Sequence, residues 1–135
     1  MKEYEVKTGL EAMDLEKIIP WLQGTYWACK RSAETIRKSL EHSVCFGAFE
    51  KDTGVQVAFA RVITDYATAY YLCDVVVEEG CRGQGVGSIL LRSIREDELL
   101  KPMRGILATR DAQDFYRHFG YVDGGDMFMQ TPVPF

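Results

Sequence analysis

Four glycines stand close together in the middle of the chain, where bare backbone could take part in binding. They are Gly80, Gly83, Gly85 and Gly87, and they lie within eight positions of one another. An apolar run of strand type precedes them at residues 75–77, and apolar residues at helical spacing follow them. The first N–H groups of a helix lack intrahelical partners and carry the positive end of the helix dipole, and glycine leaves the backbone open to a ligand. The stretch therefore predicts an anion-binding turn at the start of a helix.

The identity of the anion depends on the residues around these glycines. A Walker A loop requires Lys and then Ser or Thr after its last glycine, but Ser88 and Ile89 follow Gly87. The dinucleotide fingerprint G-x-G-x-x-G fits only if Ser88 replaces the third glycine, and no acidic residue stands on a second strand at the expected spacing of ~20 residues. Neither nucleotide motif therefore explains the turn.

Two segments of the chain match motifs of one family. Residues 82–87 read Arg-Gly-Gln-Gly-Val-Gly, which fits the pattern Gln/Arg-x-x-Gly-x-Gly/Ala that marks acetyl-coenzyme A binding in the GNAT acetyltransferase superfamily. Further along, Ala112, Tyr116 and Gly120 fall on the family's pattern Asn-x-x-Ala-x-x-x-Tyr-x-x-x-Gly-Phe. The sequence therefore resembles the GNAT family over roughly residues 44–129.

The resemblance implies a binding site for acetyl-coenzyme A as co-substrate. It implies that backbone N–H groups of the turn and the Ser88 hydroxyl hold the pyrophosphate, and that the backbone from Asp74 to Val77 pairs with the pantetheine arm. The Val76 N–H would meet the thioester carbonyl. Thr109 stands where the family often has Asn, so one hydroxyl replaces the two ends of an amide. The cofactor-binding residues implied are Val75, Val76, Val77, Arg82, Gly83, Gln84, Gly85, Val86, Gly87, Ser88, Thr109, Ala112 and Tyr116.

Acetyl transfer from a thioester to an amine needs a donor for the developing oxyanion and is helped by a proton donor at the leaving thiolate. The resemblance places the Tyr116 hydroxyl at the sulfur as that acid; the alternative interpretation is a tyrosine packed on the core beside Phe115 and Phe119. Asp74 is a carboxylate inside an apolar strand, which favours it as the general base. Asp65, in the loop before that strand, is the second candidate, as a base or as an anchor for a cationic substrate.

The acceptor pocket is predicted in a segment without regular periodicity near the N-terminus. Tyr26, Trp27 and Arg31 lie there, and loops on a rigid scaffold often carry binding residues. The alternative for the two aromatic residues is core packing beside a helix. With Asp65, these are the candidate substrate-binding residues.

Composition limits the possible functions. The chain has 135 residues, which predicts one domain over residues 1–135, and its net charge of −4 argues against nucleic-acid binding and favours a cationic or neutral small substrate. Its apolar runs fall far short of the ~20 residues of a membrane span, and its N-terminus has no apolar signal-peptide region. The four cysteines form no C-x-x-C pair, so we expect no metal site and free thiols in a cytoplasmic protein.

The elements that position these residues follow from periodicity. An antiparallel meander leads into a strand-helix-strand unit, which predicts an α+β (mixed α/β) sandwich. Its central sheet is expected to be mostly antiparallel with helices on both faces, and this order of elements is similar to the GNAT acyl-coenzyme A N-acyltransferase fold. Strands are expected at residues 4–7, 44–49, 55–63, 70–78, 106–109 and 128–131, and helices at 11–21 (stopping near Pro20), 32–39, 86–97 and 112–119. The apolar tail from Met127 to Phe135 could pair across a homodimer.

The function expected from the resemblance is transfer of the acetyl group of acetyl-coenzyme A to a primary amine of a small molecule, by direct attack in a ternary complex. Two alternatives stay open: a non-catalytic module that binds acyl-coenzyme A, and a protein N-acetyltransferase. Sequence alone does not identify the amine.

Overall fold

A computed structural model describes residues 2–132, and its centre is a five-stranded sheet with the strand order β1-β2-β3-β4-β5. The strands are β1 (Tyr4–Thr8), β2 (Val44–Glu50), β3 (Gln56–Thr64), β4 (Ala69–Val77) and β5 (Arg104–Leu107). Neighbours from β1 to β4 are antiparallel, and β5 runs parallel to β4. The helical crossover between β4 and β5 is what a parallel pair requires.

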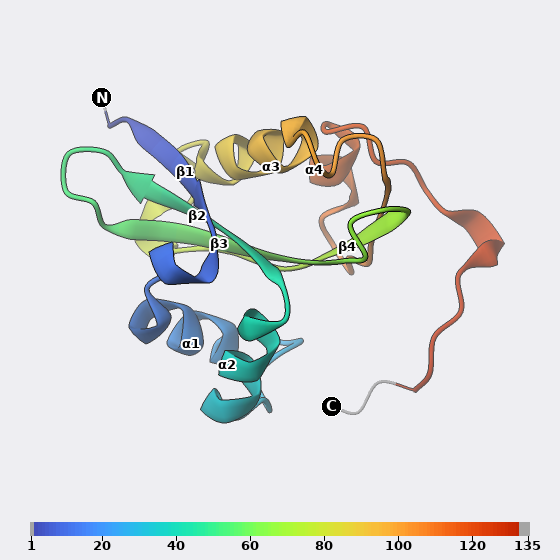
Figure 1. The fold of residues 1–135 in the computed structure, drawn as a ribbon, viewed down its shortest axis with the longest axis horizontal. Coiled ribbons are helices and arrows are strands. Elements are labelled where there is room, and N and C mark those ends of the chain that lie inside the picture. Colours follow the sequence, from blue (N-terminus) through green and yellow to red (C-terminus); the bar gives the residue numbers. More distant parts are fainter. Residues whose placement is uncertain (1, 133–135) are drawn as a thin grey trace.

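Helices cover both faces of the sheet (Figure 1). On one face lie α1 (Leu15–Gln23) and α2 (Ala33–Glu41), and on the other lies α3 (Val86–Glu96), followed after β5 by the short α4 (Gln113–Arg117). Short 3₁₀ turns occur at η1 (Leu10–Ala12), η2 (Glu79–Cys81) and η3 (Gly125–Met127). The expected α+β sandwich is confirmed. Between residues 2 and 132 the longest helix has 11 residues, and none could span a bilayer.

Each face of the sheet has its own apolar core because strand side chains alternate between the faces. The core under α3 includes Phe46, Leu90 and Ile94, and the core under α1 and α2 includes Leu22 and Phe59. All five side chains are nearly or fully buried. These two cores hold the sheet rigid between the helices and fix the strand ends that carry the candidate site.

A bulge interrupts β4 close to that site. Arg61 of β3 pairs with Cys73, but Phe59 pairs with Val76, so two residues of β4 face one residue of β3. Asp74 lies in the bulge with φ of 55°, a left-handed conformation that aspartate tolerates better than most residues do. Pairing between β4 and β5 ends at Leu72, so within residues 2–132 the rest of β4 has no strand partner on that side.

Two predicted elements, the first helix and the last strand, differ clearly from the structure, and β5 begins two residues earlier than predicted. The first helix does not stop near Pro20 but continues to Gln23, because Leu22, in its last turn, is fully buried and holds that turn against the core. The predicted strand at 128–131 is absent: the chain forms η3 and then runs without regular structure to residue 132. The last residues of the predicted apolar tail, 133–135, lie outside the described residues.

Candidate active site

The glycine turn opens directly into α3. Gly83 and Gly85 have φ values of 79° and 80°, and Gly85 is the N-cap residue of α3. A Cβ atom added at Gly80, Gly83 or Gly85 would meet no atom within 4 Å, so this side of the turn is open. The first turn of α3 carries no acidic side chain. Open backbone beside the positive end of a helix is the geometry that an anion such as a pyrophosphate requires.

The turn lies against the end of β4 and against α4. A Cβ atom at Gly87 would stand 3.5 Å from Cζ of Phe115 and 3.6 Å from Cγ2 of Val77. Arg82 is exposed, and its Nε donates to the Val77 carbonyl oxygen at 3.3 Å. The side chain of Gln84 accepts a hydrogen bond from the Tyr4 hydroxyl at 3.1 Å. Two predicted parts of the cofactor site are therefore neighbours on one continuous surface. They are the turn expected to hold the pyrophosphate and the end of β4 expected to pair with the pantetheine arm.

That strand end is free to bind a ligand through its backbone. Val75, Val76 and Val77 follow the last residue of β4 that pairs with β5, so their edge on that side has no strand partner in the described chain. Beyond β5, the Thr109 hydroxyl accepts the Ala112 N–H at 3.1 Å and so fixes the approach to α4. The hydroxyl keeps its own proton to donate.

Tyr116 lies on α4 in a half-buried aromatic cluster. Its ring is 5.2 Å from that of Phe115 and 6.1 Å from that of Tyr121, in edge-to-face arrangements. Burial, with a smaller contribution from Tyr26, raises the pKa of Tyr116 to about 12. The hydroxyl is therefore protonated at neutral pH, and within residues 2–132 it makes no hydrogen bond. The ring packs in the aromatic cluster while the hydroxyl has no partner in the described chain, and the role of Tyr116 as the acid stays a prediction.

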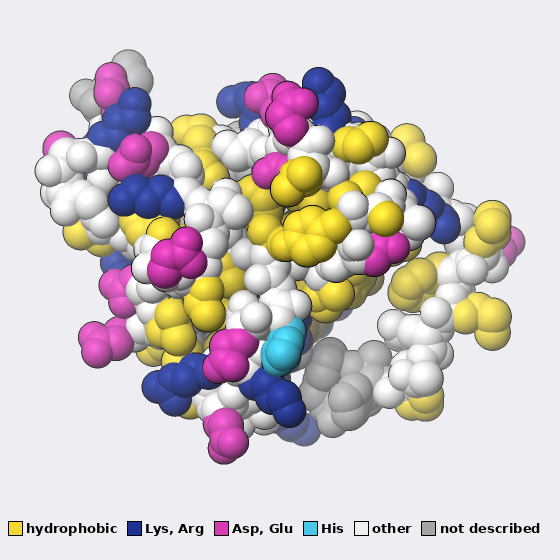
Figure 2. Space-filling view, in the orientation of Figure 1, with side chains coloured by type: hydrophobic (Ala, Val, Ile, Leu, Met, Phe, Trp, Pro, Cys, Tyr) yellow, Lys and Arg dark blue, Asp and Glu magenta, His cyan; other side chains and the backbone are white. Residues whose placement is uncertain are grey.

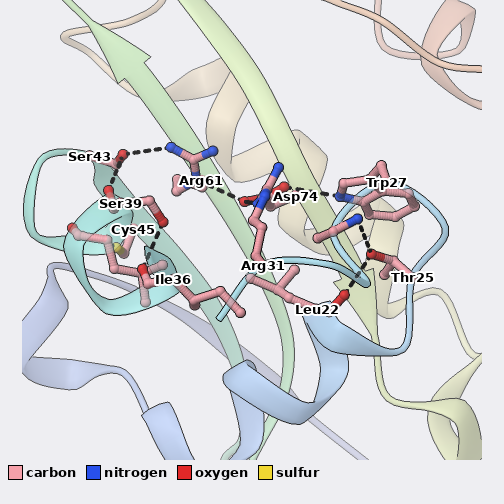
Figure 3. A network of polar contacts seen from close by, with 12 residues as sticks. Leu22, Thr25, Trp27, Arg31, Ile36, Ser39, Ser43, Cys45, Arg61 and Asp74 are labelled. Atoms are coloured by element: carbon pink, nitrogen blue, oxygen red, sulfur yellow. Dashed lines mark hydrogen bonds and ion pairs between the residues drawn. The ribbon is translucent and has the colours of Figure 1, made fainter. Parts of the chain in front are cut away.

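Asp74 is the centre of a buried polar cluster on the other side of β4 (Figure 3). Its Oδ2 accepts from Arg61 Nε at 2.8 Å and from Arg31 at 2.9 Å, and its Oδ1 accepts from Trp27 Nε1 at 3.0 Å. The side chain of Asp74 has 0% of its surface exposed. Arg61 also donates to the Ser43 hydroxyl at 3.1 Å. One carboxylate thus joins β3, β4 and the loop between α1 and α2.

This environment disfavours the predicted role of Asp74 as general base. Burial alone would raise the pKa of the carboxyl, but the charges and hydrogen bonds of Arg61 and Arg31 outweigh it and hold the pKa below its usual range. A carboxylate with three donors and a lowered pKa is a weak base with no free approach for a proton. Its geometry is that of an anchor, which positions the loop above the bulge.

The three predicted acceptor residues are brought together at this anchor. Trp27 and Arg31 both bind Asp74, and the ring of Tyr26 meets that of Trp27 edge-on at 5.0 Å. The guanidinium carbon of Arg110, in the segment between β5 and α4, lies 3.8 Å from the centre of the Tyr26 ring. This cation–π contact connects the loop after α1 with the segment that leads to Tyr116.

Sequence reasoning missed Arg61 and Arg110. A charged residue inside the apolar run Ala58-Phe59-Ala60-Arg61-Val62 should have been a signal, because a buried charge requires a partner. Arg110 gave no such signal, since an arginine in a polar segment is ordinary. Its contact with Tyr26 crosses 84 positions of sequence and depends on the fold.

Asp65 lies outside this arrangement, and its role as base or anchor stays a prediction that the geometry does not favour. It is exposed at the β3–β4 turn, where its carboxylate accepts from the N–H groups of Ala67, Thr68 and Ala69 and from the Thr68 hydroxyl. The Thr68 hydroxyl and these backbone donors hold its pKa well below its usual range. Strand register places it about 13 Å beyond the Arg61–Cys73 pair that borders the bulge, four residues at ~3.3 Å each. Asp65 shapes the turn.

No group of three or more His, Cys, Asp or Glu side chains among residues 2–132 is arranged to hold a metal ion. The four cysteines, at positions 29, 45, 73 and 81, are free in the structure.

These features define a class of protein: an α+β domain in which a glycine turn at the start of α3 lies next to the end of β4 and next to α4, the helix that carries Tyr116. The model of the acetyltransferase (GNAT) domain matches residues 41–123 of the sequence. The chain belongs to the GNAT family of acetyltransferases.

Relatives and solved structures agree with this assignment. A GNAT-family acetyltransferase structure from Xanthomonas campestris pv. campestris is 36% identical, has a TM-score of 0.91 and covers 99% of this chain and 96% of its own. A histone acetyltransferase of Glycine max is 28% identical over 117 residues, which are 85% of this chain and 47% of that protein. The chloroplastic serotonin N-acetyltransferase 2 of Oryza sativa subsp. japonica is 31% identical over 97 residues, which are 68% of this chain and 48% of that protein. The chain spans about half the length of these curated relatives.

Proposed function

We propose that the protein transfers the acetyl group of acetyl-coenzyme A to a primary amine of a small molecule, by direct attack in a ternary complex. The observation that carries this proposal is the juxtaposition of two features around Gly87: the open turn at the start of α3 and the helix that presents the free hydroxyl of Tyr116. A site for the pyrophosphate of the cofactor next to a proton donor for the leaving thiolate is what acetyl transfer from acetyl-coenzyme A can use.

The chain has groups that fit acetyl-coenzyme A. Gly83 and Gly85 leave the room in which a pyrophosphate could approach the α3 N–H groups, and the unpaired edge of residues 75–77 can bond an extended pantetheine arm. Bound acetyl-coenzyme A supplies an activated acetyl thioester. The Val76 N–H would donate to the thioester carbonyl, and the Tyr116 hydroxyl would protonate the departing sulfur.

The buried cluster offers a way to favour a neutral amine without a general base. One carboxylate and two guanidinium groups sum to a charge of +1 next to the bulge. A nearby positive charge disfavours an ammonium ion, so the pKa of an amine bound there should fall. We propose that Asp74, Arg31 and Arg61 act in this way and position Trp27, while the proton of the amine leaves through water.

The charge of +1 at the buried cluster also indicates which amines bind. It favours an anionic acceptor, whereas the overall charge of −4 favours a cationic or neutral one. The Arg31 side chain is 28% exposed and gives a single hydrogen bond, to Asp74, in the described chain, so most of its N–H groups are open to a ligand. At contact distance the charge of nearby groups affects ligand binding more than the net charge of the protein, because salt screens distant charges. We propose an acceptor that carries a carboxylate or another anionic group near its amine.

A thiol-release assay with acetyl-coenzyme A tests the reaction and the acceptor class together. Amino acids should be acetylated faster than the corresponding amines without the carboxylate, and Arg31→Gln should remove most of that preference. Equal rates for both sets would contradict the anionic acceptor. Calorimetry that detects no acetyl-coenzyme A binding would contradict the whole proposal.

Two other functions are outcomes of the same measurements. Cofactor binding without thiol release over a broad amine panel would identify a module that binds acyl-coenzyme A without catalysis. Acetylation of a peptide lysine or N-terminus, seen by mass spectrometry, would identify a protein acetyltransferase, an activity suggested by the histone acetyltransferase relative. We also propose that the protein acts in the cytoplasm, where its free thiols would stay reduced, and that it forms a homodimer.

A further inference from the structure

Helix α4, which carries Tyr116, is short and only half buried. It has five residues, and none of them is fully buried. Hydrophobic side chains lie open at the surface in the region of α3 and α4 (Figure 2). A helix of this length is not stable by itself, because its first turn fixes many backbone angles for few hydrogen bonds. The direction of the Tyr116 hydroxyl therefore depends on groups outside α4.

The chain that follows α4 turns back onto Tyr116. The N–H of Tyr121 donates to the Tyr116 carbonyl oxygen at 3.3 Å, and the N–H of Gly120 donates to the Arg117 carbonyl oxygen at 3.1 Å. This pair of bonds is a Schellman motif, and Gly120, with φ of 92°, is its left-handed residue. The ring of Tyr121 also meets that of Tyr116 edge-on, 6.1 Å away. A group that fixes Tyr121 therefore fixes the backbone and the ring of Tyr116 with it.

A pair of hydroxyl groups attaches Tyr121 to the sheet. The Tyr121 hydroxyl lies 2.6 Å from that of Tyr70, a residue of β4 that is 1% exposed. Burial and this hydrogen bond raise the pKa of Tyr121, so its hydroxyl is protonated at neutral pH. The family pattern that this segment matches ends in Gly-Phe, and phenylalanine has no hydroxyl. The bond to Tyr70 is therefore an addition that the tyrosine at position 121 makes possible.

Arg95 holds the same segment from α3. It lies in the last turn of that helix, and its Nε donates to the Phe119 carbonyl oxygen at 2.7 Å. Its guanidinium carbon lies 5.1 Å from the centre of the Tyr121 ring. A Cβ atom at Gly120 would stand 3.1 Å from Arg95 Nη2, so the glycine leaves the room that the guanidinium occupies. An arginine at the carbonyl end of a helix is also favoured by the unpaired carbonyl groups there.

We propose that Arg95 is a positioning residue, which with Tyr121 and Tyr70 holds the Tyr116 hydroxyl in the direction that protonation of the leaving sulfur requires. We call Arg95, Tyr121 and Tyr70 the tyrosine clamp. The inference rests on the proposed role of Tyr116 as the acid. One helix then serves both parts of the reaction. The first turn of α3 would hold the pyrophosphate, and Arg95, ~15 Å further along the helix axis, orients the acid.

The clamp should affect catalysis more than cofactor binding. Its three residues lie outside the glycine turn and outside the strand edge of residues 75–77. Removal of a clamp group therefore leaves in place the groups proposed to bind acetyl-coenzyme A. A small displacement of an acid from its reacting atom lowers the rate steeply. We expect losses in kcat while the KM for acetyl-coenzyme A stays unchanged.

A double-mutant cycle in the thiol-release assay tests the clamp. Arg95→Met keeps the length of the side chain but removes its charge and donors, and it should lower kcat about tenfold with an unchanged KM for acetyl-coenzyme A. In a protein that already carries Tyr116→Phe, the same substitution should lower kcat by no more than about twofold, because the acid that Arg95 positions is gone. Arg95→Lys keeps a cation that can donate to the Phe119 carbonyl oxygen, so it should recover most of the loss.

Two matched variants complete the cycle. Tyr121→Phe removes one oxygen atom, and with it the contact to Tyr70, so kcat should fall about threefold and again show little further loss in Tyr116→Phe. The control Arg37→Met removes an exposed arginine from α2, on the other face of the sheet, and should react as the wild type does.

Other results would overturn the proposal in distinguishable ways. Equal losses with and without Tyr116→Phe would mean that Arg95 stabilises the fold and does not act through Tyr116. Wild-type kcat in Arg95→Met would remove the clamp and leave the proposed function intact. A raised KM for acetyl-coenzyme A with unchanged kcat would make Arg95 a cofactor-binding residue instead. Wild-type turnover in Tyr116→Phe, or a wild-type protein that releases no thiol with any amine, would overturn the proposed function and the clamp together.

Discussion

Replacing Asp74 by Asn removes the charge at the centre of the buried cluster with little change in shape. Asn tolerates the left-handed backbone at φ of 55°, and its amide oxygen can still accept one of the hydrogen bonds. What is lost is the negative charge between Arg61, whose side chain is 10% exposed, and Arg31. Breaking a buried ion pair by removing one partner costs about 3–5 kcal/mol. We expect the low end, about 3 kcal/mol, because Arg31 can turn to solvent.

A loss of that size should lower the melting temperature by about 10 °C in a domain of this length. Asp74→Ala should be about 1 kcal/mol less stable than Asp74→Asn, since alanine adopts the left-handed conformation poorly. Asp65→Asn is the control, because an Asn side chain can form the same turn. Urea unfolding followed by circular dichroism measures all three. Unfolding of Asp74→Asn at the wild-type midpoint would refute the anchor.

The difference in stability between the wild type and Asp74→Asn should depend on pH with a definite sign. The folded pKa of Asp74 is held below that of the unfolded chain, so its contribution to stability is present above the unfolded pKa of ~3.9 and is lost as pH falls through the folded value. The gap between wild type and Asp74→Asn should be constant from about pH 5 to 8 and shrink in acid. In the pH–rate profile, the rising limb should remain in Asp74→Asn and move to lower pH, because the charge of the cluster rises from +1 to +2 and disfavours the ammonium form of the amine further. A limb abolished in a folded variant would restore Asp74 as the base.

Three further substitutions test the cleft. Tyr116→Phe should lower kcat by about 10²–10⁴-fold with unchanged affinity for acetyl-coenzyme A, and unchanged turnover would exclude Tyr116 as the acid. Because the pKa of Tyr116 is raised to about 12, its ionisation should cause no falling limb below pH 10 in the pH–rate profile of the wild type. Gly85→Ala should weaken acetyl-coenzyme A binding, measured by calorimetry, about tenfold, or about 1.4 kcal/mol, because Gly85 has a φ of 80° that alanine adopts poorly. The control is Gly80→Ala, at a site equally open but without a positive φ, which should bind the cofactor as the wild type does. Arg110→Ala should raise the acceptor KM about two- to fivefold without changing cofactor affinity, from the ~0.5–1 kcal/mol of the contact with Tyr26; a change in cofactor affinity instead would place Arg110 on the other side of the cleft.

The fold was predictable where local pattern and packing agree. The hairpin between β2 and β3 and the helix capped by Ser32, whose hydroxyl accepts from the Thr35 N–H at 3.1 Å, follow directly from sequence signals. β5 was placed two residues too late, because its start is fixed by distant contacts: Arg104 donates from its backbone to Thr68, and Gly105 packs on Tyr70. The predicted last strand is absent because a strand needs a partner, and residues 128–131 pair with no strand in the described part of the chain.

The site was predictable in its residues and less so in their roles. Asp74 was recognisable as unusual from a carboxylate among valines, but two outcomes fit that pattern: an exposed base in a pocket or a buried anion with cationic partners. The choice depends on Arg61, 13 positions earlier, and Arg31, 43 positions earlier, and no short-range rule connects them. Their convergence requires the β3–β4 register and the bulge that turns Asp74 toward the α1–α2 loop. The bulge thus places the Asp74 carboxylate among cationic partners, and we expect that it takes no part in proton transfer. In the mechanism that we propose, charge controls the amine proton, which ties the choice of acceptor to the same two arginines.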